Sequence, residues 1–241
     1  CIGARTAVVA TINNIPVAPT ASNDTLCGPG SAVLTAVPAE NCNCQWFNAN
    51  NVEITTGVSD DSRSLTTGNL SQNTSYRVHS VNTNTNCTSE YTEIQVVVAP
   101  VPGAPTVSNN ARCGEGDITL TATPGSNANT CRWYNANSEL VHEGTSYEIQ
   151  DLASTTSFTC KSYNDITGCE SSANNSRTAI ATIYPIPAQP TVQGNNPICG
   201  SGSLTLTGTP AAEATICRWI NGNDTTTNNI LSTGNLTETT T

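Results

Sequence analysis

Apolar and polar residues alternate with a period of two along much of the chain. In DITLTATP (117–124), Ile118, Leu120 and Ala122 alternate with threonine or another polar residue. TEIQVVVAP (92–100) and SRTAIATIYP (176–185) are rich in β-branched residues, and Gly, Asn and Pro interrupt the chain at short intervals. Helical periodicity is absent. Because successive side chains of a strand face opposite sides, the pattern predicts short strands that each bury one face.

The pattern recurs along the chain at a fixed interval. The motif CGxG begins every 86 residues, at Cys27, Cys113 and Cys199. A tryptophan with a cysteine two positions before it follows each motif, at Trp46, Trp133 and Trp219. Such self-similarity predicts tandem domains.

The repeats divide the chain into four segments. Residues 1–15 correspond to the C-terminal end of a preceding repeat, 16–101 and 102–186 to two complete repeats, and 187–241 to the front of a third. About seven short strands per repeat predict an immunoglobulin-like antiparallel β-sandwich. Proline-rich linkers such as APVPGAPT (99–106) favour extended conformations, so we expect an all-β, head-to-tail rod of sandwiches. In the second repeat we expect strands at 104–108, 117–123, 130–136, 139–143, 146–151, 156–164 and 177–184.

The tryptophans mark the centre of each predicted sandwich. Cys131 and Trp133 lie two positions apart on one strand, so both face inward, while Arg132 and Tyr134 face outward. We therefore expect Trp46, Trp133 and Trp219 to fill the cores of their repeats.

Four cysteines belong to the predicted cores or lie beside them. Cys160 falls on the sixth strand, which neighbours the third strand in an immunoglobulin-type sheet, so we predict a Cys131–Cys160 disulfide. The first repeat has Val78 at the position of Cys160 and an additional cysteine, Cys42. A Cys42–Cys44 ring would be strained, so two free thiols are the simpler expectation.

The CGxG cysteines have two alternative sets of partners. Pairing inside a repeat would join Cys27 to Cys87 and Cys113 to Cys169. These positions lie at opposite ends of a strand of about seven residues, roughly 23 Å apart, whereas a disulfide needs Cα atoms within about 7 Å. The end of one repeat meets the start of the next, so we favour a Cys27–Cys169 bridge between repeats. Partners outside these residues, or at the ends of the chain, are then expected for Cys1, Cys87, Cys113 and Cys199.

Composition excludes several classes of partner. The chain has 8 basic and 18 acidic residues, a formal net charge of −10 and a single lysine, Lys161, so it is unsuited to nucleic acid or to anionic membrane surfaces. No apolar run reaches membrane-spanning length, so we expect no membrane insertion. Eleven cysteines beside two histidines favour disulfides in an oxidising, extracellular compartment over zinc sites.

The ionisable residues form no catalytic or metal-binding pattern. His79 and His142 are isolated histidines, which more often pack or face solvent than catalyse. Asp60 and Asp61 are adjacent and face opposite ways on an extended chain, so they cannot act as an acid–base pair. No acidic cluster flanks the linkers to hold calcium. We expect no enzymatic activity, no cofactor and no metal.

The motifs together resemble a known family of repeats. The series CGxG…LTA…CRWY…TTSF…GC…RTAIATI…P is similar to immunoglobulin-like repeats of giant Bacteroidota cell-surface proteins, among them gliding-motility adhesins and other cargo of the type IX secretion system. The resemblance implies export to the cell surface and a stalk that supports attachment or gliding, with adjacent repeats as partners. Surface polysaccharide or other cells would bind through regions outside this sequence. Two alternatives remain: spacer modules of a secreted polysaccharide-degrading enzyme, and a self-assembling extracellular filament.

The same resemblance bears on two surface features. DTL (24–26) and DTT (224–226) are similar to the short motif on which such proteins are O-glycosylated, which implies sugar on Thr25 and Thr225 and leaves the unmodified reading open. Phe47, Tyr134 and Ile220 occupy one outward position in successive repeats. A single ring per repeat is a weak carbohydrate site, so we expect these side chains to pack against a neighbouring strand or chain.

Overall fold

The computed structural model describes residues 6–194 and 196–239. Cys1, which we expect to bond outside these repeats, lies outside the described residues, as do parts of the predicted segments 1–15 and 187–241. Within the described ranges the chain is all-β, and the 3₁₀ turn Ala173–Asn175 is the single helical segment. None of the described helical segments is long and apolar enough to cross a membrane. The predicted fold class is confirmed.

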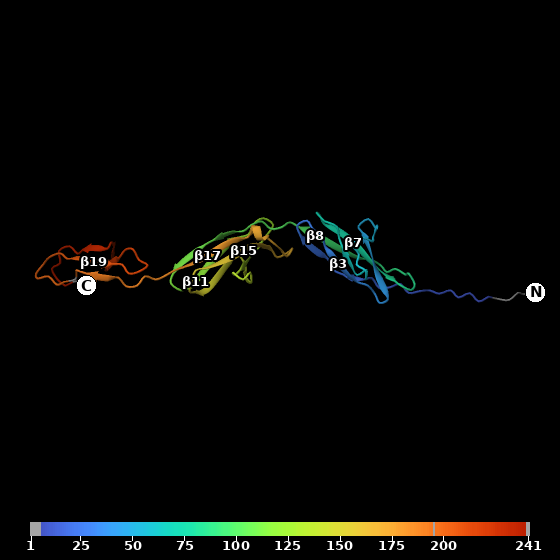
Figure 1. Ribbon diagram of the computed structural model, residues 1–241, viewed down its shortest axis with the longest axis horizontal. Helices are drawn as coiled ribbons and strands as arrows, with labels where there is room; N and C mark the ends of the chain where they lie inside the picture. Colours follow the sequence, from blue (N-terminus) through green and yellow to red (C-terminus); the bar gives the residue numbers. More distant parts are fainter. Residues whose placement is uncertain (1–5, 195, 240–241) are drawn as a thin grey trace, which may run out of the picture. The chain divides into compact units, whose positions relative to one another are not determined.

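The first repeat consists of two sheets. One contains β1 (Thr20–Ala21), β3 (Val33–Val37) and β6 (Ser64–Thr66), in that order. The other has the order β2 (Asp24–Cys27), β8 (Thr92–Ala99), β7 (Thr74–Asn82), β4 (Cys42–Asn48) and β5 (Glu53–Ile54). Strands β3, β7 and β8 are labelled together in Figure 1. The pairing of β2 with β8 is parallel, and the other printed strand pairs of this repeat are antiparallel.

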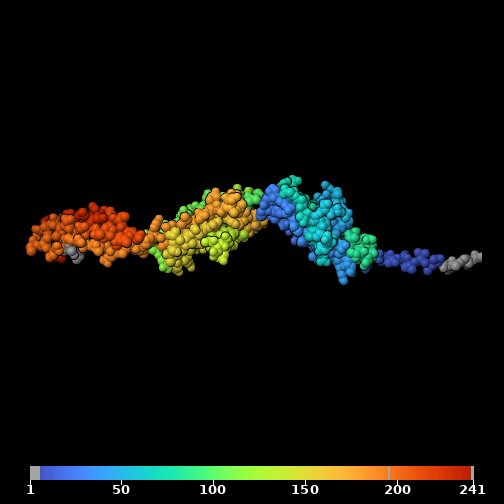
Figure 2. Space-filling view, in the orientation of Figure 1, coloured from blue at the N-terminus to red at the C-terminus, as the bar shows by residue number. Residues whose placement is uncertain are grey.

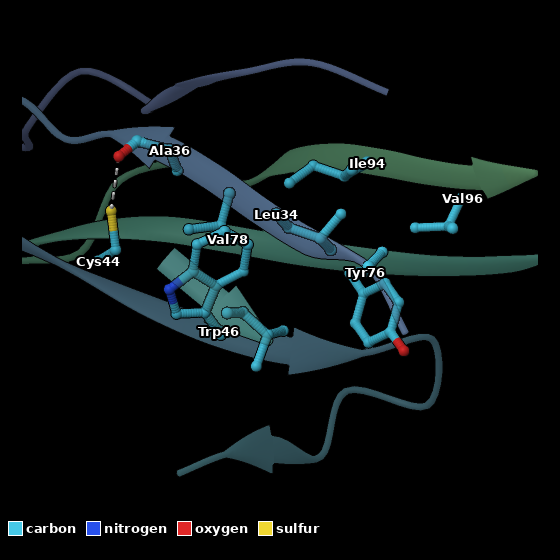
Figure 3. Packing of buried hydrophobic residues seen from close by; sticks show 10 residues of the cluster. Leu34, Ala36, Cys44, Trp46, Tyr76, Val78, Ile94 and Val96 are labelled. Carbon is cyan, nitrogen blue, oxygen red and sulfur yellow. Dashed lines mark hydrogen bonds between the residues drawn. The ribbon is translucent and has the colours of Figure 1, made fainter. Parts of the chain in front are cut away.

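The core of the first repeat lies between these two sheets. Trp46 is 1% exposed and lies among side chains from both sheets, and its indole N–H donates to the Ser62 carbonyl at 2.8 Å. Figure 3 shows Leu34 and Ala36 of β3 facing the residues of β4, β7 and β8. The residues of the latter group in the figure are Cys44, Trp46, Tyr76, Val78, Ile94 and Val96.

Residues 6–19, which precede β1, form no strand. Val8, Val9 and Ile12 are at least 85% exposed. Figure 2 shows the dark-blue start of this stretch with no other part of the chain packed against it. Pro19, at its end, is buried, and its carbonyl accepts a hydrogen bond from the Thr92 hydroxyl of β8.

The second repeat has the same plan. One sheet contains β14 (Ser146–Leu152), β11 (Gly116–Thr123) and β9 (Thr106–Ser108), in that order. The other has the order β10 (Asn110–Cys113), β17 (Arg177–Tyr184), β15 (Thr156–Asn164), β12 (Thr130–Tyr134) and β13 (Leu140–Glu143), and β16 (Cys169–Glu170) pairs with β15. Trp133 is fully buried and donates from its indole N–H to the Gly144 carbonyl at 2.9 Å.

The seven strands predicted for this repeat are all present. Two of them, β15 and β17, have the predicted bounds, and the other five agree within two residues. The predicted neighbours, the third and sixth strands, are β12 and β15. Two short strands were not expected: β10, which pairs in parallel with β17, and β16. Both are short and polar, so their own sequence carries little strand signal.

The third repeat is represented by β18 (Thr191–Gln193), β19 (Thr205–Thr209) and β22 (Ile230–Ser232) in one sheet, and by the hairpin of β20 (Arg218–Asn221) and β21 (Asp224–Thr227). Between residues 196 and 239 no strand follows β22, so the counterparts of β7 and β8 are absent from this range. Trp219, expected to fill a core, is partly buried, and its indole N–H donates to the Asn228 carbonyl at 2.7 Å.

Candidate functional site at the disulfide between repeats

The first half of the site is the CGxG turn of the first repeat. Cys27 is the last residue of β2 and pairs with Ala99, the last residue of β8. The N–H of Gly28 donates to the Ala99 carbonyl at 2.7 Å. Gly28 has a φ of +86°, and a Cβ there would lie 2.9 Å from Val101 Cγ2. Glycine is thus required both for the backbone conformation and for the close approach of the linker.

The second half is the hairpin loop between β15 and β16. The Asn164 side-chain oxygen accepts hydrogen bonds from the N–H groups of Ile166 at 3.1 Å and Thr167 at 3.0 Å. Gly168 has a φ of +71° and donates its N–H to the Asn164 carbonyl at 2.8 Å. This cap fixes Cys169 opposite Asn164 at the start of β16, where Cys169 is fully buried.

Side chains from two neighbouring strands hold β16 against the sheet. Glu170 accepts a hydrogen bond from the Tyr134 hydroxyl of β12 and forms an ion pair with Lys161 of β15 at 2.8 Å. The Lys161 ammonium also lies 4.9 Å from the centre of the Tyr134 ring. Burial and the bond to Glu170 raise the pKa of Tyr134 to about 12. The Tyr134 hydroxyl therefore stays protonated at physiological pH and continues to donate its hydrogen bond to Glu170.

A disulfide joins the two halves. Cys27 and Cys169 are bonded, with their Cα atoms 5.4 Å apart and a sequence separation of 142 positions. The structure thus contains the bridge between consecutive repeats that strand geometry favoured. The alternative pairs Cys27–Cys87 and Cys113–Cys169 are not formed, since Cys87 and Cys113 are free thiols. In the first repeat Cys27 lies at the far end of the eight-residue β8 from Cys87, a span of about 26 Å.

The linker between these repeats is anchored at several points. Pro102 and Pro105 are both less than 2% exposed. The N–H of Gly103 donates to the Ser126 carbonyl at 2.9 Å, and a Cβ on Gly103 would lie 2.7 Å from Ser126 Oγ. The loop after β11 therefore packs directly on the linker backbone. Sequence reasoning expected stiffness from proline and did not identify this contact.

The predicted Cys131–Cys160 disulfide is wrong for this structure. Both residues are fully buried and face inward, as expected, but they are free thiols joined by a hydrogen bond. The register explains the difference, because Trp133 is opposite Cys160 and Cys131 is opposite Ser162. Diagonal neighbours lie about 7–8 Å apart, beyond the usual reach of a disulfide. The hydrogen bond with Cys131, together with burial, raises the pKa of Cys160.

Cys42 and Cys44 are both free thiols. They lie two positions apart on the same face of β4, with Cys44 buried and Cys42, the first residue of the strand, partly exposed. Burial raises the pKa of the Cys44 thiol to about 11, and its Sγ contacts the Ala36 carbonyl at 3.9 Å (Figure 3). The thiol is thus protonated and unreactive at neutral pH.

The isolated histidines are packed against aromatic rings. The ring centre of His79 lies 5.3 Å from that of Phe47, and its Nδ1–H donates to the Ser89 carbonyl at 2.8 Å. His142 stacks on Tyr147 with ring centres 5.0 Å apart. Each histidine therefore has a packing role.

Asp60 and Asp61 lie in a loop of the first repeat. Asp61 accepts hydrogen bonds from the Ser59 hydroxyl at 2.6 Å and the Arg63 N–H at 3.1 Å, and these bonds lower the pKa of its carboxyl. Among residues 6–194 and 196–239 no three His, Cys, Asp or Glu side chains gather in a way that could hold a metal.

The outward positions beside the tryptophans differ in what they contact. Phe47 packs on His79, and Tyr134 is held by Glu170 and Lys161, so both rings pack on neighbouring strands. Ile220 is 71% exposed.

The two candidate glycosylation residues are both exposed. Thr25 lies on β2 at the edge of its sheet, and Thr225 lies on β21. Their side chains are therefore accessible to a modifying enzyme.

The hairpin cap could have been found in the sequence. VNTNTNC and YNDITGC share an Asn five positions before the cysteine and a Thr two positions before it. The Asn82 side-chain oxygen accepts from the N–H groups of Asn84 and Thr85 at 3.0 Å, as Asn164 does in the second repeat. An Asx turn is the recognisable signal. The role of Glu170 depends on contacts across strands and leaves no local signal.

Two sheets packed around a central tryptophan, repeated along the chain, define tandem immunoglobulin-like sandwich modules. The family described as Ig-like domain CHU_C associated matches residues 16–100 and again residues 102–185. The chain belongs to this family. No curated protein matches the chain.

Solved structures with similar folds come from diverse proteins. The fibronectin(III)-like modules of Clostridium thermocellum CbhA share 13% identity at a TM-score of 0.51, over 69% of this chain and 94% of theirs. A three-immunoglobulin fragment of titin shares 13% identity at a TM-score of 0.36, over 89% of this chain and 82% of its own. A marsupial T cell receptor shares 10% identity at a TM-score of 0.44, over 86% and 84%. At these identities the likeness concerns the fold alone.

Proposed function

We propose that this chain is a non-enzymatic stalk region of a large secreted cell-surface adhesin. It would hold a binding tip away from the cell and thereby support attachment or gliding motility. The tandem immunoglobulin-like modules fit a structural repeat region, and neither the family nor the folds it resembles indicate catalysis. The proposed repeats are 16–101, 102–186 and 187–241, preceded by the end of another repeat at 1–15.

The Cys27–Cys169 bridge is the observation that carries the proposal. A bond between consecutive repeats lets tension pass from one module to the next without first unfolding either of them. The anchored linker, with Gly103 bonded to Ser126, supports the same role. A persistent disulfide also fits an oxidising location outside the cell.

The partners follow from this role. Adjacent repeats of the same chain would be the immediate ones, and surface polysaccharide or other cells would be bound through regions beyond these residues. The acidic surface favours neither nucleic acid nor membrane insertion. Glycans on the exposed Thr25 and Thr225 would suit a cell-surface protein.

Surface labelling with a repeat deletion tests the proposal. Deleting residues 102–186 in frame joins Val101 to Pro187 and restores a linker of the same form, APVPAQPT. We expect antibodies against the chain to label intact cells that produce either form, with attachment or gliding reduced in the deletion strain. Labelling confined to permeabilised cells would contradict the proposal. A loss of polysaccharide degradation with normal attachment would favour the enzyme-spacer alternative.

A further inference from the structure

Cys113 occupies in the second repeat the position that Cys27 occupies in the first. Cys113 ends β10 and pairs in parallel with Tyr184, the last residue of β17. Cys27 ends β2 and pairs in parallel with Ala99, the last residue of β8. Cys113 is exposed and has a free thiol.

The turn after Cys113 repeats the contacts of the bonded turn. The N–H of Gly114 donates to the Tyr184 carbonyl at 2.8 Å, and Gly114 has a φ of +72°. A Cβ on Gly114 would lie 2.5 Å from Ile186 Cδ1 in the following linker, just as one on Gly28 would meet Val101. The backbone that presents Cys27 to its partner is thus reproduced at Cys113.

The partner loop is also a repeated device. Cys87 and Cys169 each donate their backbone N–H to a threonine hydroxyl two residues earlier, at 3.4 Å in both cases. The same Asx turn precedes each cysteine. In the Cys27–Cys169 bond, the partner of the CGxG cysteine is the cysteine of such a capped loop, of the form Asn-x-x-Thr-x-Cys.

We propose that Cys113 forms a disulfide with the capped-loop cysteine of the repeat that follows it, the residue equivalent to Cys169. The junction after the second repeat would then be clamped like the one before it. Cys199 is not the partner, because it opens the third CGxG motif and is the equivalent of Cys113 itself. Between residues 196 and 239 the third repeat contains no capped loop of this kind.

Formation of this bond oxidises two thiols to one disulfide. The two electrons and two protons reduce a small disulfide, such as oxidised glutathione, to two thiols by exchange through a mixed disulfide. The exposure of Cys113 gives the oxidant direct access.

A chain with a duplicated second repeat tests the proposal. A second copy of residues 102–186 inserted after Ile186 gives the junction YPIPGAPT, which matches the bridged linker APVPGAPT in form. Ile166→Val in the inserted copy, at a residue 87% exposed, marks its loop peptide by mass. After refolding with glutathione, alkylation and digestion without reduction, we expect Cys113 of the first copy bonded to the marked Cys169, and Cys27 bonded to the unmarked one.

The matched control is Cys169→Ser in the inserted copy alone, which should leave Cys113 alkylated and the bond of Cys27 intact. Alkylated Cys113 in the parent duplication, with the bond of Cys27 formed, would overturn the proposal. A bond from Cys113 to Cys87 of another molecule would overturn it too, because the partner would then be a second copy of the chain.

A peptide map of the protein isolated from its own cells needs no inserted repeat. We expect the Cys113 peptide bonded to a peptide that contains Asn-x-x-Thr-x-Cys, and a free Cys113 would refute the inference even if the inserted copy fails to fold. The inference rests on the proposed function as a tandem stalk. The two peptide maps, of the duplicated chain and of the native protein, detect disulfide bonds and do not depend on attachment. Their failure is thus distinct from failure of the surface-labelling test.

Discussion

The Cys27–Cys169 bridge should shield most of the first two repeats from a pulling force. Tension applied at the two ends of the chain reaches Cys27 and crosses one covalent bond to Cys169, so the residues between them carry none of it. The Cα atoms of the bonded residues are 5.4 Å apart, and the bond excludes a stretch of 142 sequence positions from the path of the force. At about 3.4 Å per residue, these residues would contribute roughly 480 Å to a fully extended chain.

Single-molecule force extension of the oxidised chain, held by its two ends, measures this length. We expect Cys27→Ser to lengthen the fully extended chain by roughly 480 Å relative to the parent. Cys27 is the exposed member of the pair, so its replacement by serine disturbs the fold little. Cys113→Ser, at the equivalent position with a free thiol, is the control and should leave the length unchanged. Equal lengths for the parent and Cys27→Ser without reductant would refute the reasoning.

Three further predictions concern the fold itself. Trp133→Ala should lower the free energy of unfolding by about 3–5 kcal/mol in urea titrations, because it empties the centre of a buried core; a loss well under 1 kcal/mol would contradict this. Gly28→Ala should cost about 1–2 kcal/mol from its positive φ, whereas Gly68→Ala, with no atom within 4 Å, should cost far less, and equal losses would argue against strain at the turn. Cys131 and Cys160 should resist alkylation in the folded protein and react fully in urea without reductant; protection in urea would show that they are bonded.

Much of the fold could be predicted because its causes are local. Alternation along one strand decides which side chains face inward, so Cys131 and Trp133 were placed correctly from their spacing alone. The bounds of β15 and β17 were also correct, since β17 is rich in β-branched and apolar residues and β15 alternates the inward Phe158 and Cys160 with more exposed side chains. β10 and β16 were missed because their strand conformation comes from the partner strand.

The sequence by itself determined the repeat and most of the strands. Through the length of a strand, it also determined the choice between alternative disulfides. A strand is longer than a disulfide can reach, which excludes Cys27–Cys87 in any sandwich of this topology. Only the tertiary structure decided the register between β12 and β15, which sets Cys131 diagonally from Cys160 and leaves two thiols. It also decided the contacts of Gly103 with Ser126 and of Glu170 with Tyr134. Register and contacts between distant segments depend on how whole faces pack together, and no short stretch of sequence encodes that.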